Sequence, residues 1–407
     1  MTPITSPKNG TLWTLPFKVL TILNIFIFLG FDTLLPTLTL FLESHGHSRD
    51  TIGQIFSVFI ISAILARSSA PRLVLYFRPL IIIRVGLFIC ALAVAGYYLA
   101  LTAFSASLAR FFHGLGFGLT STLVTSVAAQ IIPVNRMAQG LGFLGLGVIL
   151  TLAVGPSVGI WLMENMGFLA LFLTVGSFYA LGLIWTVFLP DVRLPAPPAG
   201  RKPKLVIISL AALAPSTLMF LLGITVSAVA VYLALYCKEI GLPYSGQFFG
   251  FSTVGIILSR IFSGPLQDRF GHRVVIAPAI GLSVAALLVI TQFQSLATVL
   301  VASVMWGLAT GTLFPCVQAL AFTSSRPELR TAVASSLFNS LDIGFGVGSI
   351  TFGLIAELAD NYRAVFWGDS VNALIFLGFY LVYYLVLHPG LRGLKSPAEK
   401  NSSGSLK

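Results

Sequence analysis

Asp32, Arg110, His113 and Asp342 are ionisable residues that lie inside long apolar runs, where a charge is costly. A charged side chain at the centre of a membrane-spanning helix costs about 2.5–3.5 kcal/mol on insertion scales, so it normally faces a cavity or a partner. A carboxylate in such a place can be loaded with a proton or unloaded as its access to water and its partner change. These residue types therefore indicate proton-coupling chemistry.

Asp32 is the candidate proton carrier. The alternative is a structural role, in which it caps a broken helix near Pro36 or bonds in the neighbourhood of Asn24. Arg110 stays cationic, so it cannot carry the proton itself. We expect Arg110 to favour the deprotonated carboxylate in one state, with bonding to carbonyl groups of a neighbouring helix as the alternative.

His113 lies one helical turn from Arg110 on the same face. We expect a hydrogen-bonded structural histidine there, and a proton relay or substrate contact is the alternative. Asp342 follows Asn339 by one turn, and we find no other acidic residue besides Asp32 deep in an apolar run. Gating, or holding its glycine-rich helix, is as good an interpretation of Asp342 as proton binding.

The composition places these residues in a membrane protein. Of 407 residues, 57% are hydrophobic and only 9% are charged, and the mean hydropathy is +0.95. A soluble domain of this size needs far more polar surface. The apolar runs are continuous rather than alternating, so the sequence predicts spanning helices of roughly 20 residues and not a β-barrel. The three cysteines are far apart in the sequence, so we expect neither a disulfide framework nor a cysteine-based metal site. We also expect no cofactor.

Twelve apolar segments should cross the bilayer. They cover residues 17–42, 52–70, 80–102, 105–131, 137–163, 166–189, 208–236, 246–263, 274–293, 295–322, 331–357 and 363–388. Residues 190–204 form a proline-rich basic linker between two halves of six segments. We therefore expect helical bundles at 1–189 and 205–388, with a tail at 389–407.

The basic residues predict the orientation. Arg49, Lys238 and Arg363 lie on one side and Arg110 lies inside a segment, whereas the rest of the 24 Lys and Arg residues lie on the opposite side or at its edge. That bias predicts that both termini are cytoplasmic. The net charge of +11 forms no basic stripe, so we expect no nucleic-acid partner.

The two halves repeat each other at a spacing of 193 positions. Gly53-Gln54 pairs with Gly246-Gln247, and Gly114-Leu115 pairs with Gly307-Leu308. Arg67 pairs in the same way with Arg260. A parallel repeat of this kind predicts a site near mid-membrane, where the halves meet.

A charged turn between the eighth and ninth segments carries the pattern Gly264-x-Leu-x-Asp268-Arg269-x-Gly271-x-Arg273. Together with twelve segments, a basic central linker and a parallel repeat, it resembles the major facilitator superfamily across nearly the whole chain. The resemblance implies an all-α polytopic fold of two six-helix bundles related by pseudo-two-fold symmetry. It also implies that this turn latches the cytoplasmic side.

The first half carries an incomplete copy of this turn motif, because Leu75 occupies the position that corresponds to Asp268 in the second half. An acidic latch partner is therefore missing from the half in which the family usually keeps its best copy. Either the second copy latches alone, or arginines of the first half, Arg67 and Arg72 among them, pair with other groups.

Three further patterns point to a branch of the family. Arg110-x-x-x-Gly114 resembles the motif of proton-coupled members, and Gly155-Pro156-x-x-Gly159 resembles the core of the helix-packing motif of antiporters, although the full motif is incomplete. The run from Leu29 to Pro36 resembles the first-helix signature of drug:proton antiporters. We therefore expect a secondary transporter in a bacterial inner membrane that exports a small amphiphilic or polar molecule by alternating access. Proton-coupled or facilitated uptake of a nutrient is the alternative.

The family fold implies a central cavity for the substrate. The lining candidates are Asn24, Phe117, Tyr232, Tyr236, Trp306, Phe314, Gln318 and Asn339. Such aromatic residues more often pack against other helices or face lipid than bind a ligand. We expect the partners to be the substrate, protons and the lipid bilayer, the protein to be a monomer, and the chain not to be an enzyme.

Overall fold

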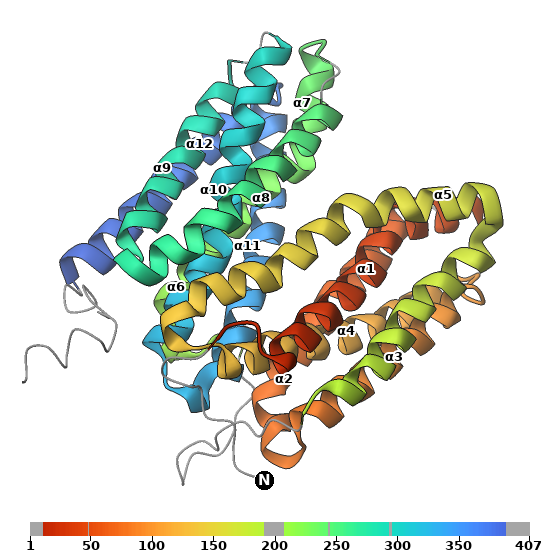
Figure 1. Cartoon of the computed structure of the whole chain (residues 1–407). Coiled ribbons are helices and arrows are strands. Elements are labelled where there is room, and N and C mark those ends of the chain that lie inside the picture. The colour runs from red at the N-terminus through yellow and green to blue at the C-terminus, as the bar shows by residue number, and fades with distance from the viewer. Residues whose placement is uncertain (1–10, 48, 191–206, 243–244, 293–294, 388–407) are drawn as a thin grey trace, which may run out of the picture. The chain divides into compact units, whose positions relative to one another are not determined.

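The described parts of the chain are entirely helical (Figure 1). The computed structural model describes residues 11–47, 49–190, 207–242, 245–292 and 295–387. Most of the predicted linker and the whole predicted tail lie outside these ranges, so the domain boundaries stay a prediction. The expectation of an all-α protein is confirmed.

The helices follow the predicted segments closely. In the first half they are α1 (Leu15–Ser44), α2 (Arg49–Tyr76), α3 (Pro79–Tyr97), α4 (Ala103–Ile131) and α5 (Met137–Trp185), with the short turns η1 (Val134–Arg136) and η2 (Thr186–Phe188). In the second half they are η3 (Leu210–Ala212), α6 (Leu213–Ser227), η4 (Ala228–Tyr232), α7 (Leu233–Glu239), α8 (Ser245–Phe270), α9 (Arg273–Ile290), α10 (Leu296–Ser324), η5 (Pro327–Leu329), α11 (Arg330–Ala359), α12 (Arg363–Leu381) and η6 (Val382–Leu387).

Local sequence sets several helix ends. Thr102 caps α4 through a reciprocal pair of bonds with Ser105, which satisfies the free N–H groups at the start of that helix. Pro79 stands in the first turn of α3, where its missing N–H costs nothing. Gly167 interrupts α5 with a φ of 79°, so α5 contains the predicted segment 137–163 and most of the segment 166–189, which continues into η2. Only glycine adopts that conformation at little cost.

Within the described residues, eleven helical stretches are long and apolar enough to cross a membrane, and the second part of α5 is one of them. The seventh predicted segment appears as η3, α6, η4 and α7 in succession, and η4 is a π-helical turn. Such turns occur often at functional sites. The chain is therefore a multi-pass membrane protein.

The helices form two compact units, each of which takes in a short piece of the other sequence half. The first unit comprises Met1–Pro133, Phe143–Ala211 and Ser325–Asn339. The second comprises Val134–Gly142, Ala212–Ser324 and Ser340–Lys407. The start of α5 thus belongs with the second unit, and the start of α11 belongs with the first.

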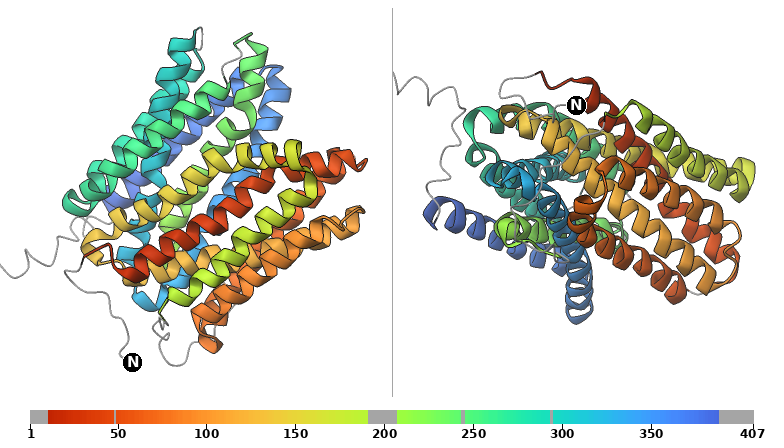
Figure 2. Two further views of the ribbon diagram at one scale, coloured as in Figure 1. Left: turned by 45° about the vertical axis from the view of Figure 1, so that its right-hand side comes forward. Right: turned by 90° about the horizontal axis from the view of Figure 1, so that it is seen from below.

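In the first unit, α4 contacts α1, α2 and α3, and Figures 1 and 2 show these helices side by side. Its most apolar stretch is 94% buried, which makes α4 the central helix of this unit. In the second unit, α10 contacts α6, α8 and α9, and α12 contacts α6 and α9. The two units therefore repeat one packing scheme with different sequences.

Glycines let helix backbones approach closely at equivalent points of the two units. A Cβ on Gly114 would lie 2.4 Å from the carbonyl oxygen of Phe59, and one on Gly307 would lie 2.0 Å from that of Ser252. These contacts are separated by the same 193 positions that relate the two sequence halves. The internal repeat is therefore present in the packing, and small residues permit it.

Candidate functional site

Asp32 lies in the middle of α1 and is only 3% exposed. Its Oδ2 accepts a hydrogen bond from the Thr151 hydroxyl of α5, with 2.8 Å between the oxygens. In the part of the chain that the structure describes, no ion pair is formed with this carboxylate. A carboxylate held by one neutral hydroxyl is poorly compensated for the water it has lost.

The glycine motif of α5 brings that helix against Asp32. A Cβ on Gly155 would lie 3.1 Å from the Asp32 Cβ and 3.1 Å from the Thr33 nitrogen. A Cβ on Gly159 would lie 2.5 Å from the Thr33 carbonyl oxygen. The glycines therefore allow the contact that lets Thr151 reach the carboxylate.

Arg110 is 1% exposed and lies among aromatic rings instead of beside Asp32. Its guanidinium carbon is 4.2 Å from the centroid of Phe56, 5.2 Å from that of Phe59 and 5.6 Å from that of Tyr97. Its Nε and Nη2 have no hydrogen-bond partner among the described residues. Ring faces attract a cation without neutralising it, so Arg110 remains able to pair with an anion.

His113 is fully buried and both of its ring nitrogens have partners. The Tyr97 hydroxyl lies 3.0 Å from Nδ1, and the Tyr179 hydroxyl lies 2.8 Å from Nε2. A neutral imidazole can satisfy this arrangement by donating to one hydroxyl and accepting from the other. The Tyr179 ring also lies 2.7 Å from the place of a Cβ on Gly30, close to Asp32 along α1. A polar chain thus extends from Arg110 through His113 toward α1.

Asp342 is partly buried in α11 and has interaction partners, so it is less isolated from water than Asp32. The expectation that it is the only other acid deep in an apolar run is wrong. Asp369 in α12 is 0% exposed and lies within the predicted segment 363–388. It lies only a short distance after Arg363, so it resembled a residue at the end of a segment.

The charged turn of the second half binds the start of α5. Both Asp268 carboxylate oxygens accept backbone hydrogen bonds, one from Ala138 at 3.0 Å and one from Gln139 at 2.9 Å. These N–H groups belong to the first turn of α5, where negative charge is stabilised. A Cβ on Gly264 would lie 2.6 Å from the Gln139 Cα, so Gly264 permits the close approach.

The remaining residues of the turn shape its end. Gly271 has a φ of 86° and ends α8, and Arg273 donates to the Tyr384 carbonyl oxygen at 3.0 Å. Arg269 lies over the ring of Phe270 at 5.1 Å. A cavity of about 410 Å³ adjoins the turn. Its lining residues are Asn135, Arg136, Gln139, Pro265, Asp268 and Arg269.

The start of α11 is attached to the end of α4. The Arg330 guanidinium is 4% exposed and donates to the Ala129 carbonyl oxygen and to Oε1 of Gln130, the latter at 2.9 Å. Both acceptors lie in the last turn of α4, whose free carbonyl groups attract a cation.

Further hydrogen bonds hold the start of α11 against α2. The Ser335 hydroxyl donates to the Arg67 carbonyl oxygen, and Asn339 Nδ2 donates to the Ser68 hydroxyl at 3.0 Å. The Arg67 guanidinium lies 5.3 Å from the Phe338 ring centroid, whereas Arg72 is exposed. The first-half contact thus relies on a cation, hydroxyls and an amide instead of a carboxylate.

The candidate cavity residues of the first unit lie in different surroundings. Asn24 Nδ2 donates to the Leu144 carbonyl oxygen at 3.1 Å, and Phe117 stacks on Phe31 with 4.6 Å between centroids. Asn339 is fully buried in the contact with α2 described above. Phe117 adjoins both Phe59 and Arg67, so it links the aromatic surroundings of Arg110 to the start of α11.

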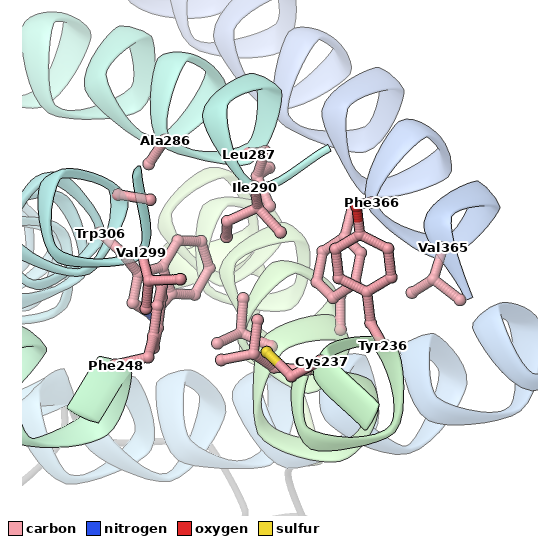
Figure 3. Close-up of a cluster of buried hydrophobic side chains, with 14 of the residues drawn as sticks. Tyr236, Cys237, Phe248, Ala286, Leu287, Ile290, Val299, Trp306, Val365 and Phe366 are labelled. Atoms are coloured by element: carbon pink, nitrogen blue, oxygen red, sulfur yellow. The ribbon is translucent and has the colours of Figure 1, made fainter. Parts of the chain in front are cut away.

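In the second unit, Tyr236 and Trp306 belong to a cluster of buried hydrophobic side chains (Figure 3). The Tyr236 ring lies 5.1 Å from that of Phe366. Tyr232 donates to the Ser349 carbonyl oxygen, Gln318 is buried and Phe314 is partly buried. The assignment of these residues to a substrate cavity stays a prediction.

A sequence model of the Major Facilitator Superfamily matches residues 20–263 and 245–406. The chain belongs to this superfamily. The fold agrees with that assignment, because the fucose:proton symporter of Escherichia coli superposes with a TM-score of 0.76 over 91% of this chain and 98% of that one, at 15% identity. The predicted fold class is therefore confirmed.

Two curated relatives carry names that refer to drug resistance. A multi-drug resistance efflux pump of Streptococcus pneumoniae, PmrA, is 25% identical over 292 residues, which cover 68% of this chain and 72% of the relative. The multidrug resistance protein MdtG of Citrobacter koseri is 26% identical over 365 residues, which cover 83% and 87%. Membership of the superfamily establishes a transporter of small molecules across a membrane.

Proposed function

We propose that this chain exports small amphiphilic or modestly polar molecules in exchange for protons. The observation that carries the proposal is the burial of Asp32 at 3% exposure with a single hydroxyl partner at 2.8 Å. A carboxylate without a nearby cation is far more stable in such surroundings when it binds a proton. Access to water or to a cation would release that proton.

Arg110 is the group that promotes release in this proposal. Its Nε and Nη2 have no hydrogen-bond partner among the described residues, and aromatic rings lie around the guanidinium, so these N–H groups are available to an anion in another state of the carrier. The polar chain of Tyr97, His113 and Tyr179 lies between Arg110 and the α1 segment that carries Asp32. Pairing of Arg110 with a negative charge would favour the deprotonated carboxylate.

Export is favoured because one relative is named as a multi-drug efflux pump and the other as a multidrug resistance protein. The bias of the basic residues supports cytoplasmic termini in an inner membrane, with Asp268 and Arg330 on the cytoplasmic side. A proton crossing 100 mV supplies about 2.3 kcal/mol, which suffices for modest accumulation of one substrate molecule. The carrier would work as a monomer by alternating access.

The test uses everted membrane vesicles with ethidium as the probe. An imposed inward-acid gradient should drive ethidium into vesicles that contain the wild-type protein. Asp32→Asn keeps the side-chain size but cannot ionise, so we expect it to abolish gradient-driven accumulation. Asp360→Asn, which neutralises an exposed acid after α11, is the matched control and should transport normally.

A pH-sensitive dye inside proteoliposomes gives the direction. Ethidium movement against proton movement indicates exchange, whereas movement of both in one direction indicates symport. Normal gradient-driven transport by a well-inserted Asp32→Asn variant would refute the proposal.

A further inference from the structure

Asp369 and Asp32 are the buried acids of the described chain, and Asp369 is the more enclosed at 0% exposure. Its Oδ1 lies 3.4 Å from Nδ2 of Asn372, one turn further along α12. The Thr225 hydroxyl of α6 contacts the same Asn372 amide, which donates to it at 2.7 Å. The Oδ2 of Asp369 has no partner among the described residues.

Among the described residues, no cation is paired with the Asp369 carboxyl group. Helix α6 carries no titratable residue, and the one charged residue of α9, Arg273, is the first of that helix and bonds to the Tyr384 carbonyl oxygen. Tyr232 of η4 donates to the Ser349 carbonyl oxygen. Along α12 itself, the charged residue besides Asp369 is Arg363, at its first position.

The direction of the hydrogen bonds leaves one place for a proton. Asn372 Nδ2 donates to the Thr225 hydroxyl at 2.7 Å and to the Leu221 carbonyl oxygen at 3.2 Å. Because Thr225 accepts from Asn372, its own hydrogen is free to donate to Asp369. The carboxyl group therefore has hydrogen-bond donors at Oδ1 but none among the described residues at Oδ2, and a proton bound to Oδ2 would remove the uncompensated negative charge.

The internal repeat relates this cluster to Asp32. At 193 positions, Leu29-Gly30-x-Asp32 pairs with Leu222-Gly223-x-Thr225. Ser177, Tyr179 and Ala180 pair in the same way with Ser370, Asn372 and Ala373. Thr225 thus holds the place of Asp32, and Asn372 holds the place of Tyr179, the tyrosine beside Gly30.

We infer that Asp369, with Thr225 and Asn372, is a second proton-binding site, located in the second unit. The first unit places its acid on α1, and the second unit places its acid on the facing helix α12 instead. Each acid has a threonine hydroxyl close by: Thr151 donates to Asp32, and Thr225 shares the Asn372 amide with Asp369. The inference builds on proposed proton coupling, but protonation of Asp369 can be measured without any transport.

A proton suits this site better than a metal ion. It offers one carboxylate, one amide and one hydroxyl, and the described residues contain no group of three His, Cys, Asp or Glu side chains that could hold a metal. Multivalent cations generally require several charged or strongly coordinating oxygens. A single proton needs only the free Oδ2.

Infrared difference spectroscopy of the purified full-length protein tests the site. The carbonyl stretch of protonated carboxylic acids should contain a component that Asp369→Asn removes, in the wild type and in an Asp32→Asn background alike. Thr225→Val keeps the acid but removes its hydrogen-bond donor, so it should shift this component without removing it. Asp360→Asn should leave the component in place.

A component that stays unchanged in Asp369→Asn would overturn the inference, because Asp369 would then be ionised. Loss of the component when sodium replaces potassium at constant pH would also overturn it, in favour of a cation site. In proteoliposomes with ethidium, Asp369→Asn should reduce the protons moved per substrate, and an unchanged ratio would refute a role in coupling. Failure of the first proposal would instead appear as normal gradient-driven transport by Asp32→Asn.

Discussion

Replacing Asp268 by alanine should release the start of α5 from α8. The carboxylate accepts hydrogen bonds from the backbone N–H groups of Ala138 and Gln139 at 3.0 and 2.9 Å. Hydrogen bonds to charged groups contribute about 1.5–3 kcal/mol, and loss of a helix-capping side chain costs about 0.5–2 kcal/mol. Asp268 is partly exposed, so we take about 2 kcal/mol for both bonds together.

That free energy corresponds to about a 30-fold change in the equilibrium between bound and released α5. Thiol labelling can measure it, because Ala138 is 0% exposed in the bound arrangement. In an Ala138→Cys background, the labelling rate follows the released population when release is fast compared with labelling. Asp268→Ala should therefore raise the rate by about 30-fold, and Asp268→Asn, which keeps one acceptor oxygen, should raise it less.

The three native cysteines are buried, so the protein without Ala138→Cys provides the background. Asp360→Asn controls for removal of a negative charge elsewhere. A labelling rate that does not change in Asp268→Ala would show that the carboxylate does not hold α5. Altered substrate preference at an unchanged labelling rate would show that the turn recognises substrate instead of controlling the gate.

Two further changes test the other contacts. Arg330→Met removes the donors to the last turn of α4, at a loss of about 1.5 kcal/mol. It should therefore raise the labelling rate of an Ala128→Cys thiol, at a position that is 0% exposed, by about tenfold. Arg326→Met, nearby on the chain, is the control, and equal labelling rates in the two variants would refute the role of Arg330. Gly155→Val should push α5 away from Asp32 at a cost of about 1–3 kcal/mol, seen as a lower melting temperature and lost transport, whereas Gly176→Val, with open space around its Cβ, should change neither.

The membrane fold could be predicted from sequence because apolar length and the 193-residue repeat are strong, additive signals. The helix boundaries at Pro79 and Thr102 follow from local chemistry. Asp32 and Arg110 were evident because a charge in an apolar run is conspicuous. That Arg110 does not pair with Asp32 could not be predicted from the sequence, because the aromatic rings around Arg110 come from α2 and α3.

Asp369 illustrates what sequence reasoning misses. Its run, Arg363 to Ser370, is more polar than the other segments, so the acid resembled part of a helix end. Burial comes from α6, which lies more than a hundred residues earlier and supplies Thr225 and the Leu221 carbonyl oxygen. A comparison of repeat-equivalent positions would have paired Asp32 with Thr225 and drawn attention to the helix that faces it.

The two charged contacts at the starts of α5 and α11 explain how the first half can lack an acidic latch. Asp268 places a negative charge on the N-terminal end of α5, and Arg330 places a positive charge on the C-terminal end of α4. The helix dipole favours each charge at its own end, so opposite charges achieve the same kind of attachment. The start of α11 is thus attached through a cation, although the first half has no acid at Leu75. Low pH should weaken the Asp268 contact by protonating its carboxylate and leave the Arg330 contact intact, because a guanidinium keeps its charge.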